Sequence, residues 1–433
     1  ETPPNPDSFF GAHAEQQNPD FHLAFVKKLG AKWVRCHDII QMTWWEIVEP
    51  EDDRWNWRDE QCATIRKHGF HILGEFCMTP AWAARVPESG VKDRRDLRTY
   101  PPKSWDEYAE YVYETVNHFK RDVRHWEVWN EPNHSGFWRG TPEEYAHLLK
   151  VTHQAAKKAD PTCVIVGVGG VALSQMPWLE RAFAAGLASY MDDMSTHGYV
   201  DAVTPMDMLE TESRLPAFRA LLRKHDFKGG LWDSEHSVIG TSFIDDFRLD
   251  HLEEDAPYHF RRAAETMMKT YVFEVAQGYK RVFPYMTKWL ARNDNEAAWR
   301  ARPLNQNLFD VYGTPKPMAV AHATTAYMME GSRYRETLDL SANVQVYVYE
   351  RGADLLACYW GRYGKARTQG HLRLPAPKAL DLTRVERVDI MGNHHAVRPE
   401  DESVLLPLSP EPVWLWFHGQ PSAAVIGWLK QAR

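Results

Sequence analysis

Two glutamates stand where predicted strands end, and each is placed for acid–base chemistry. The tryptophans and valine of residues 125–129 predict a strand, which Pro132 must end because proline cannot donate to a sheet ladder. Asn130 and Glu131 then lie at the tip of that strand. A glutamate there is a candidate general acid/base, and an asparagine is a candidate partner for a substrate hydroxyl. Glu235 ends a later predicted strand and is the second candidate.

Alternating strands and helices must hold these tips together. The helical pattern includes Pro216 in the first turn of its helix and a Ser-Trp-Asp-Glu capping box that begins at Ser104. The predicted strands cover residues 9–13, 32–37, 70–76, 125–129, 163–168, 194–199, 230–236 and 279–286. The predicted helices cover residues 20–29, 59–68, 104–120, a segment from 141, 176–185, 215–225, 257–277 and 314–329. Eight strands, each followed by a helix, predict an α/β protein with a (β/α)8 TIM barrel over residues 9–330.

After Gly331 the pattern changes to short runs of alternating polarity separated by turn residues. The runs are residues 344–350, 354–359, 370–374, 383–389, 403–407 and 413–418. We expect residues 331–433, together with residues 1–8, to form a small C-terminal antiparallel β-sandwich domain.

The active site of a barrel lies at the carboxyl ends of its strands, and strands four and seven lie nearly opposite each other. Glu131 and Glu235 can therefore face each other across the pocket. Paired carboxylates are what glycoside hydrolysis needs, by a retaining or an inverting route according to their separation. We expect Arg35 to keep Glu235 ionised as the nucleophile. Further candidates for substrate binding at these ends are His37, Trp82, His197, Tyr199, Tyr285 and Trp289.

Composition bounds the class of protein. The chain has 433 residues, a net charge of −8 and no basic run, which argues against nucleic acid as a partner. No apolar run approaches the ~18 residues that a membrane span needs, so no membrane partner is expected. We expect a secreted or periplasmic protein whose signal peptide has been removed, although a cytoplasmic location stays open. The five scattered cysteines fit no metal-binding spacing.

The order of the motifs resembles that of the retaining (β/α)8 glycoside hydrolases of clan A, and most of all family 39. That family holds β-xylosidases, α-L-iduronidases and some bacterial exopolysaccharide hydrolases. The resemblance is carried by residues 35–37, 79–82, 129–133, 195–199 and 233–235. It implies that Glu131 is the acid/base, that Glu235 is the nucleophile, and that Asn130 binds the sugar 2-hydroxyl. It therefore implies a retaining hydrolase of poly- or oligosaccharides.

Several alternatives stay open from the residues. Glu127 and Glu75 are interpreted as structural carboxylates of the barrel interior. A catalytically silent carbohydrate-binding barrel, a metal-dependent hydrolase, and an exo-acting β-xylosidase-like enzyme in place of an endo-acting one are the competing functions. We expect no cofactor and no metal, and the oligomeric state is not predicted. An anionic substrate is an option because cationic side chains gather at Lys92, Arg94, Arg95, Arg98, Arg292, Arg300 and Arg302. Residues 241–257 and 291–306 match no known pattern and are expected to set the substrate.

Overall fold

A computed structural model describes most of the chain. The described residues are 5–13, 19–37, 41–88, 90–201, 209–239, 249–285, 308–309, 314–341, 343–361 and 370–432; for 200–201, 209–211, 237–239 and 249–259 only the backbone is described.

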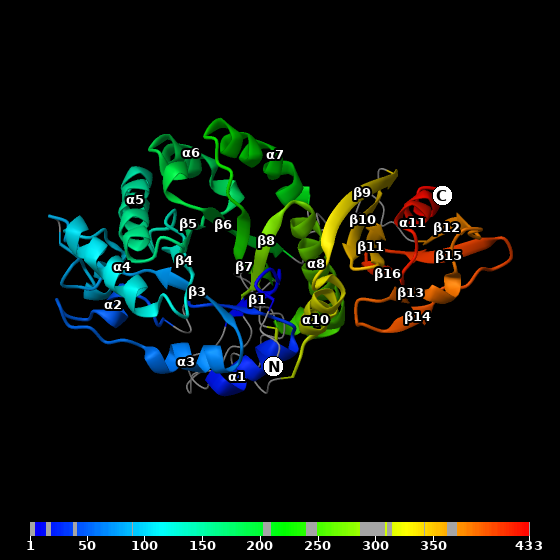
Figure 1. The fold of residues 1–433 in the computed structure, drawn as a ribbon, viewed down its shortest axis with the longest axis horizontal. Helices are drawn as coiled ribbons and strands as arrows, with labels where there is room; N and C mark the ends of the chain where they lie inside the picture. Colours follow the sequence, from blue (N-terminus) through cyan, green and yellow to red (C-terminus); the bar gives the residue numbers. More distant parts are fainter. Residues whose placement is uncertain are drawn as a thin grey trace.

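Eight parallel strands form one sheet in the order in which they occur in the chain, which confirms the predicted barrel (Figure 1). A parallel bridge between Phe10 and Val282 joins the first strand region to the last and closes the barrel. The strands are β1 (Gly11–His13), β2 (Trp33–Arg35), β3 (His71–Phe76), β4 (His125–Val128), β5 (Val164–Gly170), β6 (Asp193–Asp201), β7 (Leu231–Ile239) and β8 (Tyr279–Pro284).

Helices cover the outside of the barrel (Figure 1). They are α1 (Pro19–Lys28), α2 (Trp45–Val48), α3 (Asp59–Lys67), α4 (Trp105–Phe119), α5 (Pro142–Ala159), α6 (Met176–Ala184), α7 (Leu209–Lys224), α8 (Leu249–Ala276) and α10 (Pro317–Met329). Two of them start earlier than predicted. The run before Leu215 is largely polar, so it carries little helical periodicity, and Pro216 lies inside α7 instead of in its first turn. The predicted start of α8 at residue 257 also lies inside the helix.

Side-chain caps fix the helices that follow β3 and β4. Ser104 accepts the amide of Glu107 at the start of α4, which is one half of the predicted capping box. The full reciprocal box occurs instead at α5, where Thr141 accepts the amide of Glu144 and the Glu144 carboxylate accepts the amide of Thr141. These caps help to hold the β3–α4 and β4–α5 connections, which carry residues at the rim of the site.

An apolar layer fills the barrel below the site. Trp33, Trp232 and Phe283 are buried there, and the rings of Trp232 and Phe283 stack 6.1 Å apart. Trp33 precedes Arg35 by two residues on β2, so both side chains point inward from the same face of the strand. The buried charged side chains of the site therefore lie next to an apolar layer, which excludes solvent from that side of the barrel.

The C-terminal part contains a six-stranded sheet in the order β14-β13-β16-β11-β10-β9 and a two-stranded sheet of β12 and β15. Its elements are β9 (Arg333–Ser341), β10 (Val344–Arg351), β11 (Asp354–Gly361), β12 (Gly370–Pro375), β13 (Val385–Val388), β14 (His394–Ala396), β15 (Ser403–Leu408), β16 (Val413–Phe417) and the helix α11 (Ser422–Leu429). Its pairs are antiparallel, as predicted. The boundary at residue 330 and the assignment of residues 1–8 to this part stay predictions.

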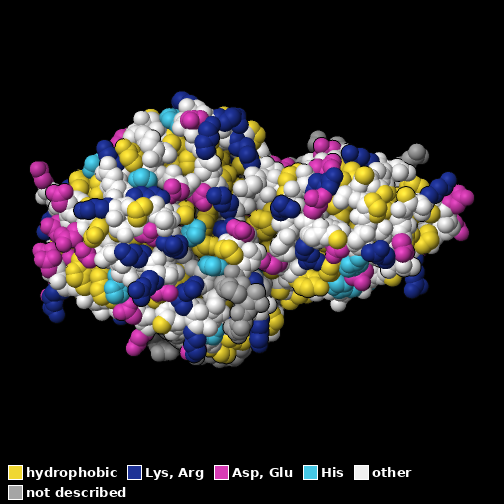
Figure 2. Space-filling model, viewed as in Figure 1, with side chains coloured by type: hydrophobic (Ala, Val, Ile, Leu, Met, Phe, Trp, Pro, Cys, Tyr) yellow, Lys and Arg dark blue, Asp and Glu magenta, His cyan; other side chains and the backbone are white. Residues whose placement is uncertain are grey.

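The two parts lie side by side and give the molecule an elongated outline (Figures 1 and 2). Tyr349 of β10 donates a hydrogen bond to the carbonyl of Val272 in α8, and Trp414 of β16 belongs to the same buried cluster as the barrel helices. Acidic side chains gather at the left edge of the barrel in Figure 2, and Asp52, Asp53 and Glu110 interact electrostatically on the barrel surface. Among the described helices, none has the length and apolarity to cross a membrane.

Candidate active site

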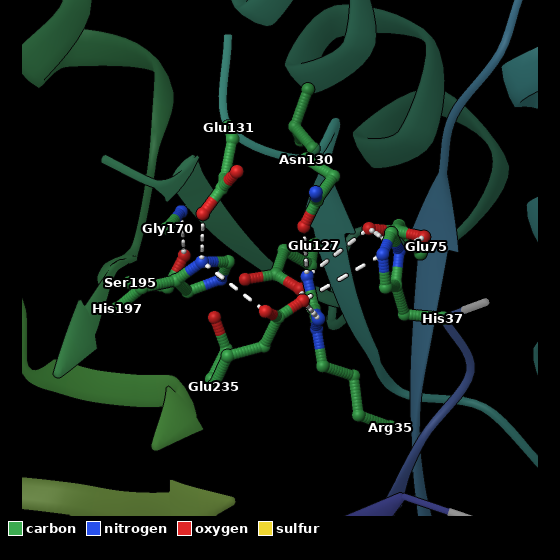
Figure 3. A network of polar contacts seen from close by, with 12 residues as sticks. Arg35, His37, Glu75, Glu127, Asn130, Glu131, Gly170, Ser195, His197 and Glu235 are labelled. Carbon is green, nitrogen blue, oxygen red and sulfur yellow. Dashed lines mark hydrogen bonds and ion pairs between the residues drawn. The ribbon is translucent and has the colours of Figure 1, made fainter. Parts of the chain in front are cut away.

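Arg35 is the centre of the polar network inside the barrel mouth (Figure 3). Its guanidinium is fully buried and donates to Glu127 at 2.5 Å, to Glu235 at 2.6 Å and to Asn130 at 2.9 Å. It also contacts Glu75 at 3.2 Å. Since a buried cation and buried carboxylates each cost much free energy alone, this mutual pairing is what permits them there. The predicted structural role of Glu127 as a partner of Arg35 agrees with these contacts.

Glu235 is held on both oxygens. Oε1 accepts from Arg35, and Oε2 accepts from the Tyr199 hydroxyl at 2.6 Å. Burial alone would raise the pKa of Glu235, but the nearby charges of His197 and Arg35 outweigh it and hold the pKa well below the ordinary value. Burial and the Glu235 charge raise the pKa of Tyr199, so this hydroxyl keeps its proton and stays a donor. Glu235 is therefore a fixed, ionised carboxylate.

Glu131 occupies a different environment. Its side chain is 29% exposed, against 6% for Glu235. The chain reaches this position through an irregular backbone, because Trp129 and Glu131 have positive φ angles of 67° and 38°. Such conformations cost about 1–3 kcal/mol each and persist where surrounding contacts impose them. The Glu131 amide donates to the carbonyl of Gly169 at 2.6 Å, so the end of β5 holds the tip of β4 in place.

His197 lies between the two carboxylates (Figure 3). Its Nδ1 is 2.9 Å from Glu131 Oε1 and 3.5 Å from Glu235 Oε2. Burial lowers the pKa of His197, but the Glu235 charge and the hydrogen bond to Glu131 outweigh it and raise the pKa. His197 thus contacts both carboxylates.

The glycines at the end of β5 make this arrangement possible. Gly170 has φ +84°, and a Cβ there would lie 1.9 Å from Nε2 of His197. The Gly170 amide in turn donates to Ser195 of β6. The sequence indicated close approach at these glycines but not which side chain approaches. That side chain is His197.

His37 and Trp44 support the network from the β2 side. His37 Nδ1 is 2.8 Å from Glu75, and the Trp44 indole donates to Glu75 at 2.6 Å. Burial raises the pKa of Glu75, against the lowering effect of His37 and Arg35. His37 Nε2 also lies 3.6 Å from Glu235. These contacts agree with the predicted structural role of Glu75, and nothing in the spacing of the two residues showed that Glu75 meets Trp44.

The other predicted substrate-binding residues are less central. Tyr285 makes edge contacts with the rings of Tyr199 and His13, at 6.5 and 5.1 Å. Trp82 packs edge-on against Trp45 and donates to the carbonyl of Glu49. No hydrogen bond, ion pair or ring contact between described residues joins Trp82 to either catalytic candidate. Trp289 lies outside the described residues.

The predicted cationic cluster is partly paired with acids. Arg95 forms an ion pair with Asp93 at 2.6 Å, and Arg98 forms one with Glu46 at 2.6 Å. Lys92 and Arg94 are exposed, whereas Arg292, Arg300 and Arg302 lie outside the described residues. The paired arginines therefore give no specific support for an anionic ligand.

Ligand atoms of Glu131, His197 and Glu235 lie within 4.8 Å of one another, which is close enough for a metal ion. Both Glu235 oxygens, however, already accept hydrogen bonds, one of them from the cationic Arg35. Arg35 also places a positive charge where a bound cation would be repelled. These contacts favour proton chemistry over a metal at the site.

Comparisons with known proteins agree with this geometry. The family described as Glycosyl hydrolases family 39 matches residues 12–222. A Beta-xylosidase from Caldicellulosiruptor saccharolyticus is 38% identical over 109 residues, which are 23% of this chain and 22% of that protein. A Beta-xylosidase from Geobacillus stearothermophilus is 31% identical over 155 residues, which are 29% of this chain and 30% of that protein. The matches thus span less than a third of these curated relatives.

Solved structures share the whole fold. A family 39 glycoside hydrolase from Bacteroides cellulosilyticus WH2 has a TM-score of 0.70 at 20% identity, covering 94% of this chain and 80% of that one. A family 39 Beta-xylosidase from Caulobacter crescentus has a TM-score of 0.62 at 15% identity, covering 97% of each chain.

The eight-stranded barrel, the network at its mouth and the family match over residues 12–222 make this chain similar to glycoside hydrolases of family 39, as its motifs predicted.

Proposed function

We propose that this protein cleaves O-glycosidic bonds of a poly- or oligosaccharide by double displacement, with Glu235 as nucleophile and Glu131 as acid/base. The observation that carries the proposal is the facing pair itself. An oxygen of Glu131, in the loop after β4, and an oxygen of Glu235, on β7, lie within 4.8 Å of each other. Retaining enzymes have carboxyl groups ~5–5.5 Å apart, whereas inverting enzymes leave ~6.5–9.5 Å for a water. Nearest oxygens this close leave little room for a water between the two carboxylates, which supports a retaining route.

In the first step, a Glu235 oxygen attacks the anomeric carbon while Glu131 gives its proton to the departing glycosidic oxygen. The anomeric carbon–oxygen bond breaks, and a glycosyl ester on Glu235 forms. In the second step, Glu131 takes a proton from water, and the resulting hydroxide displaces Glu235. The ionised, buried Glu235 and the more exposed Glu131 match these two roles.

Neighbouring groups support each role. Arg35 and Tyr199 hold Glu235 so that one oxygen can face the sugar, and Asn130 is positioned by the same guanidinium to bond a sugar hydroxyl. Those hydrogen bonds orient the nucleophile before the substrate arrives, which removes part of the reorganisation cost of the reaction.

The substrate class follows from the relatives. Both curated relatives are Beta-xylosidases, so we propose a β-linked xyloside as the first substrate to test, with exo action as the first expectation. An endo-acting polysaccharide hydrolase is the alternative, and a secreted or periplasmic location stays a prediction.

The test is turnover on aryl β-xylosides and on a panel of polysaccharides, with NMR of the first-formed anomer. We expect retention of configuration and a loss on the order of 10⁴-fold or more in kcat for Glu235→Gln, since loss of a catalytic nucleophile has such effects. Glu51→Gln, at an exposed ion pair with Arg54, is the matched control and should keep activity. Inversion of configuration, or near-normal turnover by Glu235→Gln, would overturn the proposal.

A further inference from the structure

A second polar cluster lies behind the active site and takes no part in the proposed reaction. It consists of Asp233 and His236 on β7 and Glu274 on α8, and all three side chains are buried. One ligand atom from each lies within 4.8 Å of the others. Asp233 Oδ2 and His236 Nδ1 are 3.2 Å apart.

Four polar atoms of this cluster have no hydrogen-bond partner among the described residues. They are Asp233 Oδ2, Glu274 Oε2 and both ring nitrogens of His236. Leaving such groups unpaired costs about 1–3 kcal/mol each, and more when they are charged. The fully buried His236 ring beside two carboxyl groups is therefore an unexplained feature of the interior.

The two carboxyl groups of the cluster also lie close to each other without, among the described residues, a neutralising arginine such as the one at the active site. Burial raises the pKa of Glu274 well above its ordinary value, and the charge of Asp233 and a hydrogen bond with Asp233 raise it further. At the active site, by contrast, Arg35 neutralises the buried carboxylates. A proton shared between Asp233 and Glu274 would relieve their repulsion. It would leave His236 Nε2 and Glu274 Oε2 without a hydrogen-bond partner, whereas one cation would bind all three side chains together.

We propose that Asp233, His236 and Glu274 bind one divalent cation of the zinc or manganese class as a structural site. One imidazole and two carboxylates suit these ions, which accept mixed nitrogen and oxygen ligands. Ligands ~2.0–2.1 Å from a tetrahedral ion lie about 3.3 Å apart, close to the separation of Asp233 Oδ2 and His236 Nδ1. Glu274 would complete the protein ligands, since one of its oxygens lies within 4.8 Å of the other two ligand atoms.

The location gives such an ion a structural role. Asp233 Oδ1 accepts the amide of Gly198, the residue between His197 and Tyr199 on β6. A Cβ on Gly198 would lie 2.3 Å from Asp233 Oδ2 and 3.1 Å from Glu274 Oε1, so the glycine makes room for both carboxyl groups. The ion would brace β6 against β7 and α8, just where the β6–β7 register shifts between Thr196 and His197.

Metal content tests this without any substrate, so the result does not depend on the proposed hydrolase activity. The full chain is purified without chelator or affinity metal, and bound elements are counted by mass spectrometry. Chain stripped by chelator is then titrated with Zn²⁺ and with Mn²⁺ while thermal unfolding is followed. We expect one equivalent of metal per chain and a rise in Tm of at least a few degrees on reloading, as expected for a ligand that binds only the folded state.

Variants separate this site from adventitious binding. His236→Ala and Glu274→Gln should each lose the stoichiometric metal and the metal-dependent rise in Tm. His225→Ala removes a histidine at the end of α7 whose Nε2 also lacks a partner among the described residues, and it should keep both. Absence of stoichiometric metal together with an unchanged Tm in either ion would overturn the proposal. Metal retained by a folded His236→Ala variant would also overturn the proposal. The measurement on the wild-type chain does not depend on the variants, so it tests the proposal even if a variant folds poorly.

Discussion

Arg35 Nη1 lies 2.6 Å from Glu235 Oε1. This contact pairs the buried guanidinium of the barrel interior with the proposed nucleophile. The same guanidinium donates to Glu127 and Asn130. One residue of β2 thus fixes carboxylates from β4 and β7, so the architecture of the site depends on a single buried cation.

Replacing Arg35 with methionine should therefore destabilise the protein. Buried carboxylates that lose their cation typically cost about 3–5 kcal/mol, and urea unfolding at pH 7 would measure the loss. Arg54→Met is the control, because its pair with Glu51 is exposed at 71% and 66% and such pairs contribute about 0–1 kcal/mol.

The pH dependence of this loss has a defined sign. Arg35 lowers the folded-state pKa of Glu235, so its contribution is present above the unfolded pKa of about 4.5 and is lost as pH falls through the lower folded value. The difference between wild type and Arg35→Met should hence shrink at acid pH. Equal differences at pH 7 and at acid pH would contradict this account of Arg35.

Tyr199→Phe should raise the pKa of Glu235, because the hydroxyl at 2.6 Å stabilises its ionised form. A hydrogen bond to a charged group contributes about 1.5–3 kcal/mol, so the acid limb of kcat/KM should move up by about one to two pH units. The measurement is the pH profile of kcat/KM on an aryl glycoside. A lower rate with an unmoved acid limb would mean that Tyr199 serves substrate binding alone.

Glu131→Ala should lose activity on natural substrates but much less on an aryl glycoside with a good leaving group, which needs no proton. Azide can then replace water in the second step, so added azide should restore turnover and yield a glycosyl azide of retained configuration. Asn133→Ala is a control at the same loop, and azide should leave its rate unchanged. Failure of azide to act on Glu131→Ala would remove Glu131 from the acid/base role.

Gly170→Ala tests whether the space left by Gly170 positions the His197 ring. The added methyl would lie 1.9 Å from the His197 ring, so kcat/KM should fall by an order of magnitude or more as the ring is displaced from Glu131. Gly186→Ala has the same left-handed strain at φ +91° but meets no atom within 4 Å. Both variants should lose about 1–2 kcal/mol from the left-handed backbone, Gly170→Ala should lose more because of its clash, and only Gly170→Ala should lose activity. Equal activity of the two variants would exclude steric seating of His197.

Much of the fold was readable from the sequence because barrel strands are buried on both faces and their helices carry strong caps. The eight strands and the Thr141 cap are of this kind. The early start of α7 was missed because the residues before Leu215 have little apolar periodicity. Propensity and periodicity report burial, so a polar helical turn leaves a weak signal.

By itself the sequence determined which residues are the candidates for the chemistry. Glu131, Glu235, Arg35 and His197 follow from residue type and position at strand ends. Tertiary structure alone decided which of them meet, because distances between strand ends depend on barrel closure and backbone turns that no local pattern encodes. It brought His197 into the space that Gly170 leaves open, turned Trp82 toward Trp45, and gathered Asp233, His236 and Glu274 from two elements into one buried cluster.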